Sequence, residues 1–72
     1  MKMRYSAKRE VINSEEFGEY ITYGIQIYND GELIREISDV STSERKVADL
    51  CECCNRLKLD PIHIDDVIED IL

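Results

Sequence analysis

The chain has 72 residues, of which 35% are charged and 43% hydrophobic, and its formal net charge is −7. A chain of this length is expected to form one domain, residues 1–72, whose small core leaves no room for a deep substrate cleft. The acidic balance disfavours nucleic-acid binding, which needs Lys and Arg gathered on one face, and no apolar stretch approaches the length of a membrane span.

The compartment is predicted from the cysteines and from the start of the chain. Residues 1–9 are basic, but no apolar run follows them, so we expect no export signal. The three cysteines are an odd number, which does not suit a framework of paired disulfides. Together these features favour free thiols in a reducing cytoplasm.

Two stretches show the alternation of a strand with one buried face. The first, residues 2–8, places Met3, Tyr5 and Ala7 on one side. A connection is expected over residues 13–19, and the second strand follows over residues 19–28. Its expected core residues are Ile21, Tyr23, Ile25 and Ile27, with Tyr20, Thr22, Gln26 and Tyr28 on the opposite face.

The sequence Asn-Asp-Gly at 29–31 predicts a hairpin, because Gly31 takes a positive φ without steric cost. We expect a three-residue loop, because it keeps apolar residues on one face of the sheet. The pairs that it predicts are Ile27 with Leu33 and Tyr23 with Ile37. A two-residue loop would instead oppose Ile25 to Glu36. A third strand and a meander follow from either loop.

From residue 41 the apolar period becomes that of a helix. Ser41 and Glu44 have the spacing of a capping box, in which Ser41 accepts a hydrogen bond from the Glu44 amide. The apolar stripe of this helix is Val47, Leu50, Cys51, Cys54 and Leu57.

A second helix is predicted directly afterwards. Asp60 is a suitable N-cap, and Pro61 occupies the first helical position, where its missing N–H costs nothing. Leu59 precedes the cap and is expected to pack on Ile64. The apolar stripe of this helix is Ile64, Val67, Ile68, Ile71 and Leu72.

The cysteines and the single histidine, His63, raise the question of a metal or redox site. On a helical wheel Cys51 and Cys54 fall inside the apolar stripe, whereas Cys53 lies at its edge. A zinc site needs converging ligands, which Cys53 does not supply, and His63 is expected on the surface of the second helix. We therefore predict that Cys51 and Cys54 are core residues, that Cys53 is the accessible and reactive thiol, and that no metal is bound.

Two surfaces are candidates for partner binding. The last helix carries an acidic stripe opposite its apolar one, formed by Asp65, Asp66, Glu69 and Asp70. Its like charges four residues apart repel each other, so a basic partner would stabilise it, although a solvated face is the simpler interpretation. The open sheet face offers Tyr20 and Tyr28, which suit a protein partner or a second copy of the chain better than stacked bases.

Three segments resemble a family of short clostridial proteins known as a domain of unknown function. They are YGIQIY at 23–28, REISDVSTSERKV at 35–47 and DPIHIDDVIEDIL at 60–72, and PIHIDDVIEDIL is the most specific part. The resemblance covers most of the chain and implies strands followed by helices. It implies no activity, cofactor or binding residue. It also implies aliphatic residues where this chain has Cys51 and Cys54, which favours packing roles for both.

We therefore predict an α+β fold, a three-stranded antiparallel β-meander followed by two helices packed on one face. No catalytic constellation is present, so we expect a non-catalytic protein-interaction or regulatory module without a cofactor, acting through a protein partner or as a homodimer. The homodimer would use Tyr20 and Tyr28 or an edge strand. Two alternatives are a thiol-based metal or redox sensor that uses Cys51, Cys53 and Cys54, and an acidic mimic of nucleic acid.

Overall fold

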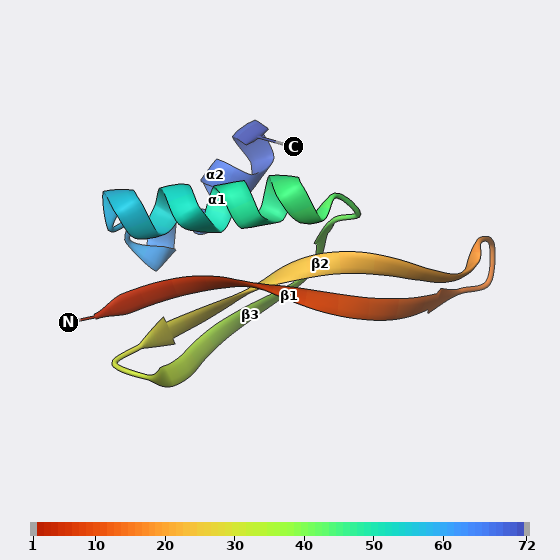
Figure 1. Cartoon of the computed structure of the whole chain (residues 1–72), viewed down its shortest axis with the longest axis horizontal. Coiled ribbons are helices and arrows are strands. Elements are labelled where there is room, and N and C mark those ends of the chain that lie inside the picture. The colour runs from red at the N-terminus through yellow and green to blue at the C-terminus, as the bar shows by residue number, and fades with distance from the viewer. Residues whose placement is uncertain (1, 72) are drawn as a thin grey trace.

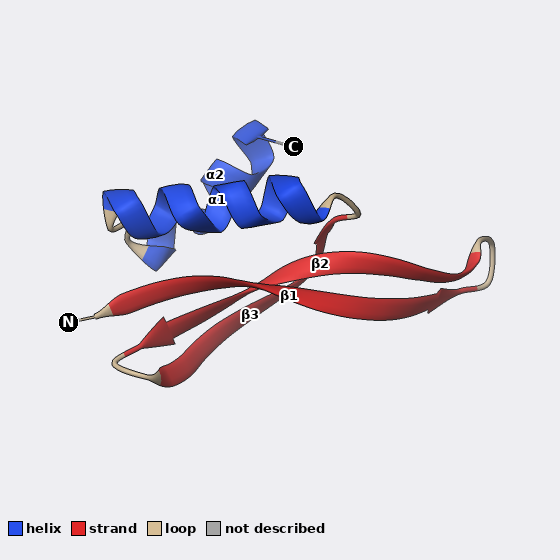
Figure 2. Cartoon of the chain, viewed as in Figure 1, coloured by secondary structure: helices blue, strands red, loops and turns tan. Residues whose placement is uncertain are grey.

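The computed structural model describes residues 2–71 and confirms the predicted α+β architecture (Figures 1 and 2). Its elements are β1 (Met3–Ser14), β2 (Gly18–Asn29), β3 (Glu32–Ser41), α1 (Glu44–Leu57), a 3-10 turn (Pro61–His63) and α2 (Ile64–Ile71). The strands form one antiparallel sheet in the order β1-β2-β3. Both helices lie on the same face of this sheet, as predicted (Figure 1).

The core lies between α1 and the helix-facing side of the sheet. Its buried apolar residues are Tyr5, Ile25, Ile27, Val47, Leu50, Cys51, Cys54 and Ile64. The helix contributes every third or fourth residue and the strands every second one, which is the pattern on which the prediction rested. The last two stripe positions, Leu72 and the side chain of Ile71, lie outside what the structure describes.

The outer half of the β1–β2 hairpin extends beyond the helices and is called here the arm, residues 9–23 (Figure 1). The two strands pair without a bulge from Met3↔Asn29 to Ser14↔Gly18, so the connection is shorter than the predicted 13–19. The arm gives the molecule its long dimension of 41 Å against 25 and 18 Å for the others. Ile21, predicted to be buried, is therefore 44% exposed, because no helix covers it.

The β2–β3 hairpin differs from the predicted three-residue loop. Asp30 (φ 51°) and Gly31 (φ 84°) both have positive φ and form a two-residue turn between Asn29 and Glu32. An extra residue, Ile34, then bulges between the pairs Tyr28↔Leu33 and Ile27↔Arg35. The bulge shifts the register so that Ile25 faces Ile37 instead of Glu36, and both predicted pairs are wrong.

A second irregularity of β3 lies opposite Gly24. Ile25 pairs with Ile37 and Tyr23 with Ser41, so residues 38–40 of β3 face the single residue Gly24. Asp39 at the centre of this bulge has a φ of 52°. A Cβ on Gly24 would collide with the Ile37 carbonyl oxygen and with the Glu10 carboxylate, so glycine permits this close crossing.

Of the two predicted helix N-caps, the first is wrong and the second is confirmed. The α1 cap is Ser43, whose Oγ accepts a hydrogen bond from the Lys46 amide at 3.4 Å, and not Ser41. Ser41 is still paired with Tyr23 in the sheet, so its backbone cannot enter the helix there. The Asp60 cap is confirmed, since its carboxylate accepts from the Ile62 amide at 3.1 Å.

Candidate interaction surfaces

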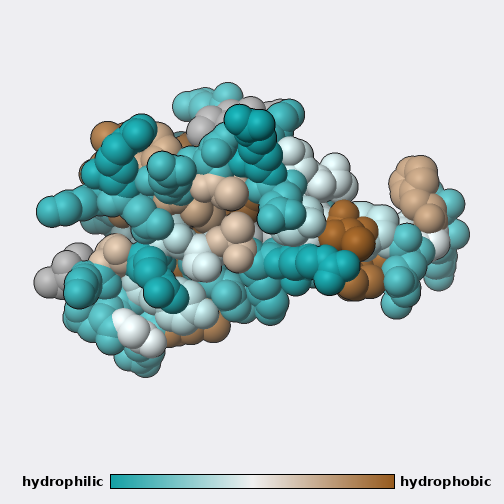
Figure 3. Space-filling view, viewed as in Figure 1, coloured by the Kyte–Doolittle hydropathy of each residue, from teal (hydrophilic) through white to brown (hydrophobic). Residues whose placement is uncertain are grey.

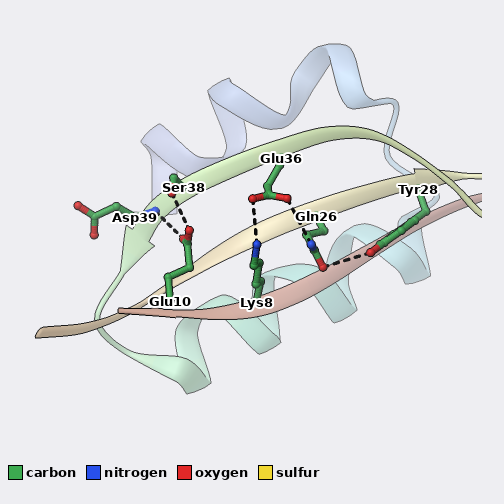
Figure 4. A network of polar contacts seen from close by, with 7 residues as sticks. All are labelled: Lys8, Glu10, Gln26, Tyr28, Glu36, Ser38 and Asp39. Atoms are coloured by element: carbon green, nitrogen blue, oxygen red, sulfur yellow. Dashed lines mark hydrogen bonds and ion pairs between the residues drawn. The ribbon is translucent and has the colours of Figure 1, made fainter. Parts of the chain in front are cut away.

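The sheet face away from the helices carries a chain of polar contacts (Figure 4). Lys8 Nζ lies 3.1 Å from Glu36 Oε1, and Gln26 Nε2 donates to Glu36 Oε2 at 3.3 Å. The Tyr28 hydroxyl then donates to Gln26 Oε1 at 3.2 Å. The hydrogen bonds from Lys8 and Gln26 lower the pKa of Glu36. The polar groups of these side chains therefore find hydrogen-bond partners within one network that spans all three strands.

Tyr28, a predicted binding residue, lies at one end of this chain of contacts. The Arg4 guanidinium carbon stands 5.2 Å from the centre of its ring, within the range of a cation–π contact. Both residues line a surface hollow of about 790 Å³ that also reaches Lys2, Asp30 and Asn55. Tyr28 is thus half-buried and already stacked, which leaves only part of its ring for a partner.

Tyr20 belongs to a different cluster, built around the bulge at Asp39. Its hydroxyl donates to Asp39 Oδ2 at 3.2 Å, while the Thr22 hydroxyl lies 2.7 Å from Asp39 Oδ1. Glu10 accepts from the Ser38 hydroxyl at 2.7 Å and from the Asp39 amide at 3.1 Å (Figure 4). Thr22, predicted to lie on an open face, is fully buried under this bulge.

The structure does not bring the two predicted tyrosines together. Tyr20 pairs with Ile12 on the arm, and Tyr28 pairs with Arg4 near the other end of the sheet. At about 3.3 Å per residue, eight strand positions separate them by roughly 26 Å. They therefore belong to two surfaces, and Tyr28, unlike Tyr20, is part of the chain of contacts in Figure 4.

The acidic stripe of α2 is partly paired within the molecule. Arg35 Nη2 donates to Asp65 Oδ1 at 2.8 Å and to Oδ2 at 3.0 Å. The cation comes from β3, on the helix-facing side next to Ile27, and not from the basic residues 1–9. The remaining acidic side chains of the stripe, Asp66, Glu69 and Asp70, are exposed.

The cysteines lie as the helical wheel predicts. Cys51 and Cys54 are buried, Cys53 is half-buried, and all three are free thiols. Burial raises the pKa of Cys51 to about 11 and also raises that of Cys54, so both stay protonated at neutral pH. Among residues 2–71, no three His, Cys, Asp or Glu side chains gather as a metal site requires, and His63 is exposed.

The arm carries an apolar surface that the sequence-based prediction missed. Val11 and Ile21 face each other across β1 and β2 and are 53% and 44% exposed, and Phe17 at the tip is 79% exposed. Figure 3 shows apolar atoms on the arm, apart from those of the helical body.

The length of β1 explains why this surface was missed. A 14-residue helix is about 21 Å long, whereas a 12-residue strand is about 40 Å, so α1 cannot cover β1. The predicted first strand ended at residue 8 and left out the part of β1, up to Ser14, that extends past the helix. The signal in the sequence was Val11, which continues the odd-numbered apolar series beyond Arg9.

The fold and these surfaces define a small α+β domain with a projecting two-stranded arm. Neither helix in residues 2–71 is long and apolar enough to cross a membrane. The sequence belongs to the family of unknown function DUF6514, which it matches over residues 1–72. No curated protein and no solved structure matches it.

Proposed function

We propose that this protein is a non-catalytic, cytoplasmic interaction module that acts by binding another polypeptide through its arm. The observation that carries the proposal is the exposed apolar pair Val11 and Ile21, together with Phe17 at the tip. Single exposed apolar residues are ordinary on a protein surface, but a group on one projecting element is typical of an interaction site. We also expect the members of this family to be clostridial, as the sequence resemblance implies.

The two alternatives have weaker support. A thiol sensor needs a reachable thiolate, and burial with raised pKa values keeps Cys51 and Cys54 protonated. A nucleic-acid mimic needs a continuous acidic surface, and the ion pair of Asp65 with Arg35 interrupts the stripe on α2. The net charge of −7 supports a protein partner over nucleic acid.

Site-specific photo-crosslinking tests the proposal. A photoreactive residue at Phe17 is compared with the same residue at Leu57, another exposed apolar position, which lies on α1 and is 67% exposed. We expect defined cross-linked species from the arm position, either to itself or to one host protein, and their loss when Ile21→Ser is added. Equal or absent cross-linking at both positions would remove the support for an arm-directed function.

A further inference from the structure

The edge of β1 that faces away from β2 is hydrogen-bonded to a helix side chain at Tyr5, and beyond Tyr5 it faces solvent. Both backbone groups of Tyr5 bond to the side chain of Asn55, so they point away from β2. In an antiparallel ladder this orientation repeats at every second residue. Because β1 pairs with β2 without a bulge, the backbone groups of Ala7, Arg9, Val11 and Asn13 point to the same edge.

This open segment is a template for another strand. Helix α1 covers the edge of β1 only along the length of the helix, and the arm lies beyond the helix (Figure 1). We infer that the arm edge pairs with the same edge of a second copy, β1 antiparallel to β1, with Val11 opposite Val11. This inference rests on the proposed interaction function and names its partner.

Charge disfavours the two registers that are centred on Arg9 and Glu10. The two copies present the same face to the same side, so opposing residues are both odd-numbered or both even-numbered. A pairing centred on Arg9 would oppose two arginines, and one centred on Glu10 would oppose two glutamates, which is unfavourable. Centred on Val11, Arg9 of one copy instead faces Asn13 of the other, and Glu10 faces Ile12.

The same register joins the exposed apolar residues. Ile21 already lies beside Val11 within each copy, so pairing at Val11 creates a continuous row of Ile21, Val11, Val11 and Ile21 across four strands. Each side chain in that row loses water-exposed surface that the single chain leaves open. The contact also stops before Tyr5 of the other copy, whose edge is occupied by Asn55.

The interface is short, because only the segment from Arg9 to Asn13 lies fully within it. Stable protein interfaces bury about 1,200–2,000 Å² in total, and a few strand residues per copy fall below that range. We therefore expect a weak dimer that dissociates on dilution, and not a permanent one.

Charge reversal at the symmetry centre tests the contact. Val11→Lys and Val11→Glu each place like charges opposite each other, so each variant alone should be monomeric in sedimentation over a concentration series. Val11 is half-exposed in the single chain, so both variants should fold, which circular dichroism checks. An equimolar mixture of the two should regain dimers, and the control Ile62→Lys, at a 75% exposed position off the arm, should dimerise like the natural chain.

Disulfide trapping tests the register. In a Cys53→Ser background with oxidised glutathione added as the oxidant, Val11→Cys should form a disulfide-linked dimer rapidly, because opposing hydrogen-bonded residues lie about 5.5 Å apart between Cα atoms. Arg9→Cys should not. Faster trapping at Arg9→Cys would overturn the register, and a natural chain that stays monomeric at the highest concentration would overturn the dimer. Arm cross-links to a host protein in that monomer would leave the interaction function standing.

Discussion

Asn55 of α1 holds both backbone polar groups of Tyr5 on β1. The Tyr5 amide donates to Asn55 Oδ1 at 2.7 Å, and Asn55 Nδ2 donates to the Tyr5 carbonyl at 2.9 Å. The Asn55 side chain thus supplies the two hydrogen bonds that a neighbouring strand would otherwise make to Tyr5. In addition, the Tyr5 hydroxyl donates to the Leu59 carbonyl at 2.5 Å. The helix, the following turn and the edge strand are joined at one residue.

Asn55→Ala should therefore destabilise the fold. The Tyr5 amide and carbonyl both lose their partner, and we expect a loss of about 1–3 kcal/mol in the free energy of unfolding. Denaturant unfolding measures it, with the exposed neighbour Arg56→Ala as control. Equal stability of the two variants would show that water replaces Asn55 without cost.

Gly24→Ala should also destabilise the protein. The new methyl group would meet the Ile37 carbonyl and the Glu10 carboxylate, and forcing the strands apart should cost about 1–3 kcal/mol. Thermal unfolding of Gly24→Ala, compared with that of the natural chain, measures the loss. The double variant Glu10→Ala, Gly24→Ala should recover only part of the loss, because the Ile37 carbonyl remains.

Stability should decline in alkali. Burial raises the pKa of Cys51 from its usual 9.0 to about 11 and that of Tyr5 from 10.0 to about 12. Between those values the unfolded chain has released protons that the folded chain still holds, so unfolding becomes easier as pH rises. The contribution of Cys51 is complete below pH 9 and lost through about pH 11. Cys51→Ala should flatten this part of a stability profile, measured by denaturant unfolding.

One thiol should react before the other two. Cys53 is half-buried, while Cys51 and Cys54 are buried, so a thiol reagent applied to native protein should label Cys53 first. Cys53→Ser should abolish the fast phase and leave stability nearly unchanged. In denaturant all three thiols should react together. A fast phase that survives Cys53→Ser would show that the helix opens readily.

Replacing Asp65 and replacing Asp66 on α2 should change the stability of the fold in different ways. Asp65→Asn removes the carboxylate that pairs with Arg35, and since both side chains are substantially exposed the loss should be no more than about 1 kcal/mol. Asp66→Asn removes a repelling charge that has no ion pair within residues 2–71, and should be neutral or slightly stabilising. High salt should reduce the difference between the two variants, because it screens exposed charges. Identical effects in low salt would contradict the ion pair in solution.

The order of elements and the core residues were predictable because both depend on the spacing of apolar residues within short segments of the sequence. Alternation marked Tyr5, Ile25 and Ile27, and helical spacing marked Val47, Cys51 and Cys54, all of which are buried. The Asp60 cap was predictable for the same reason, since the Asp60 carboxylate and the Ile62 amide that donates to it lie only two residues apart. None of these features needs knowledge of a distant residue.

The candidate surfaces depended on contacts between distant residues. The bulge at Ile34 sets the β2–β3 register, and the bulge at Asp39 buries Thr22, yet neither has a mark in the local pattern. The pairing of Asp65 with Arg35, and of Asn55 with the backbone of Tyr5, joins residues 30 and 50 positions apart. Which residues lie in the core follows from side-chain chemistry and the local spacing of apolar residues, and both can be read from the sequence. How far α1 covers the sheet depends instead on where rigid elements of different length come to lie, and this is why the arm stays exposed.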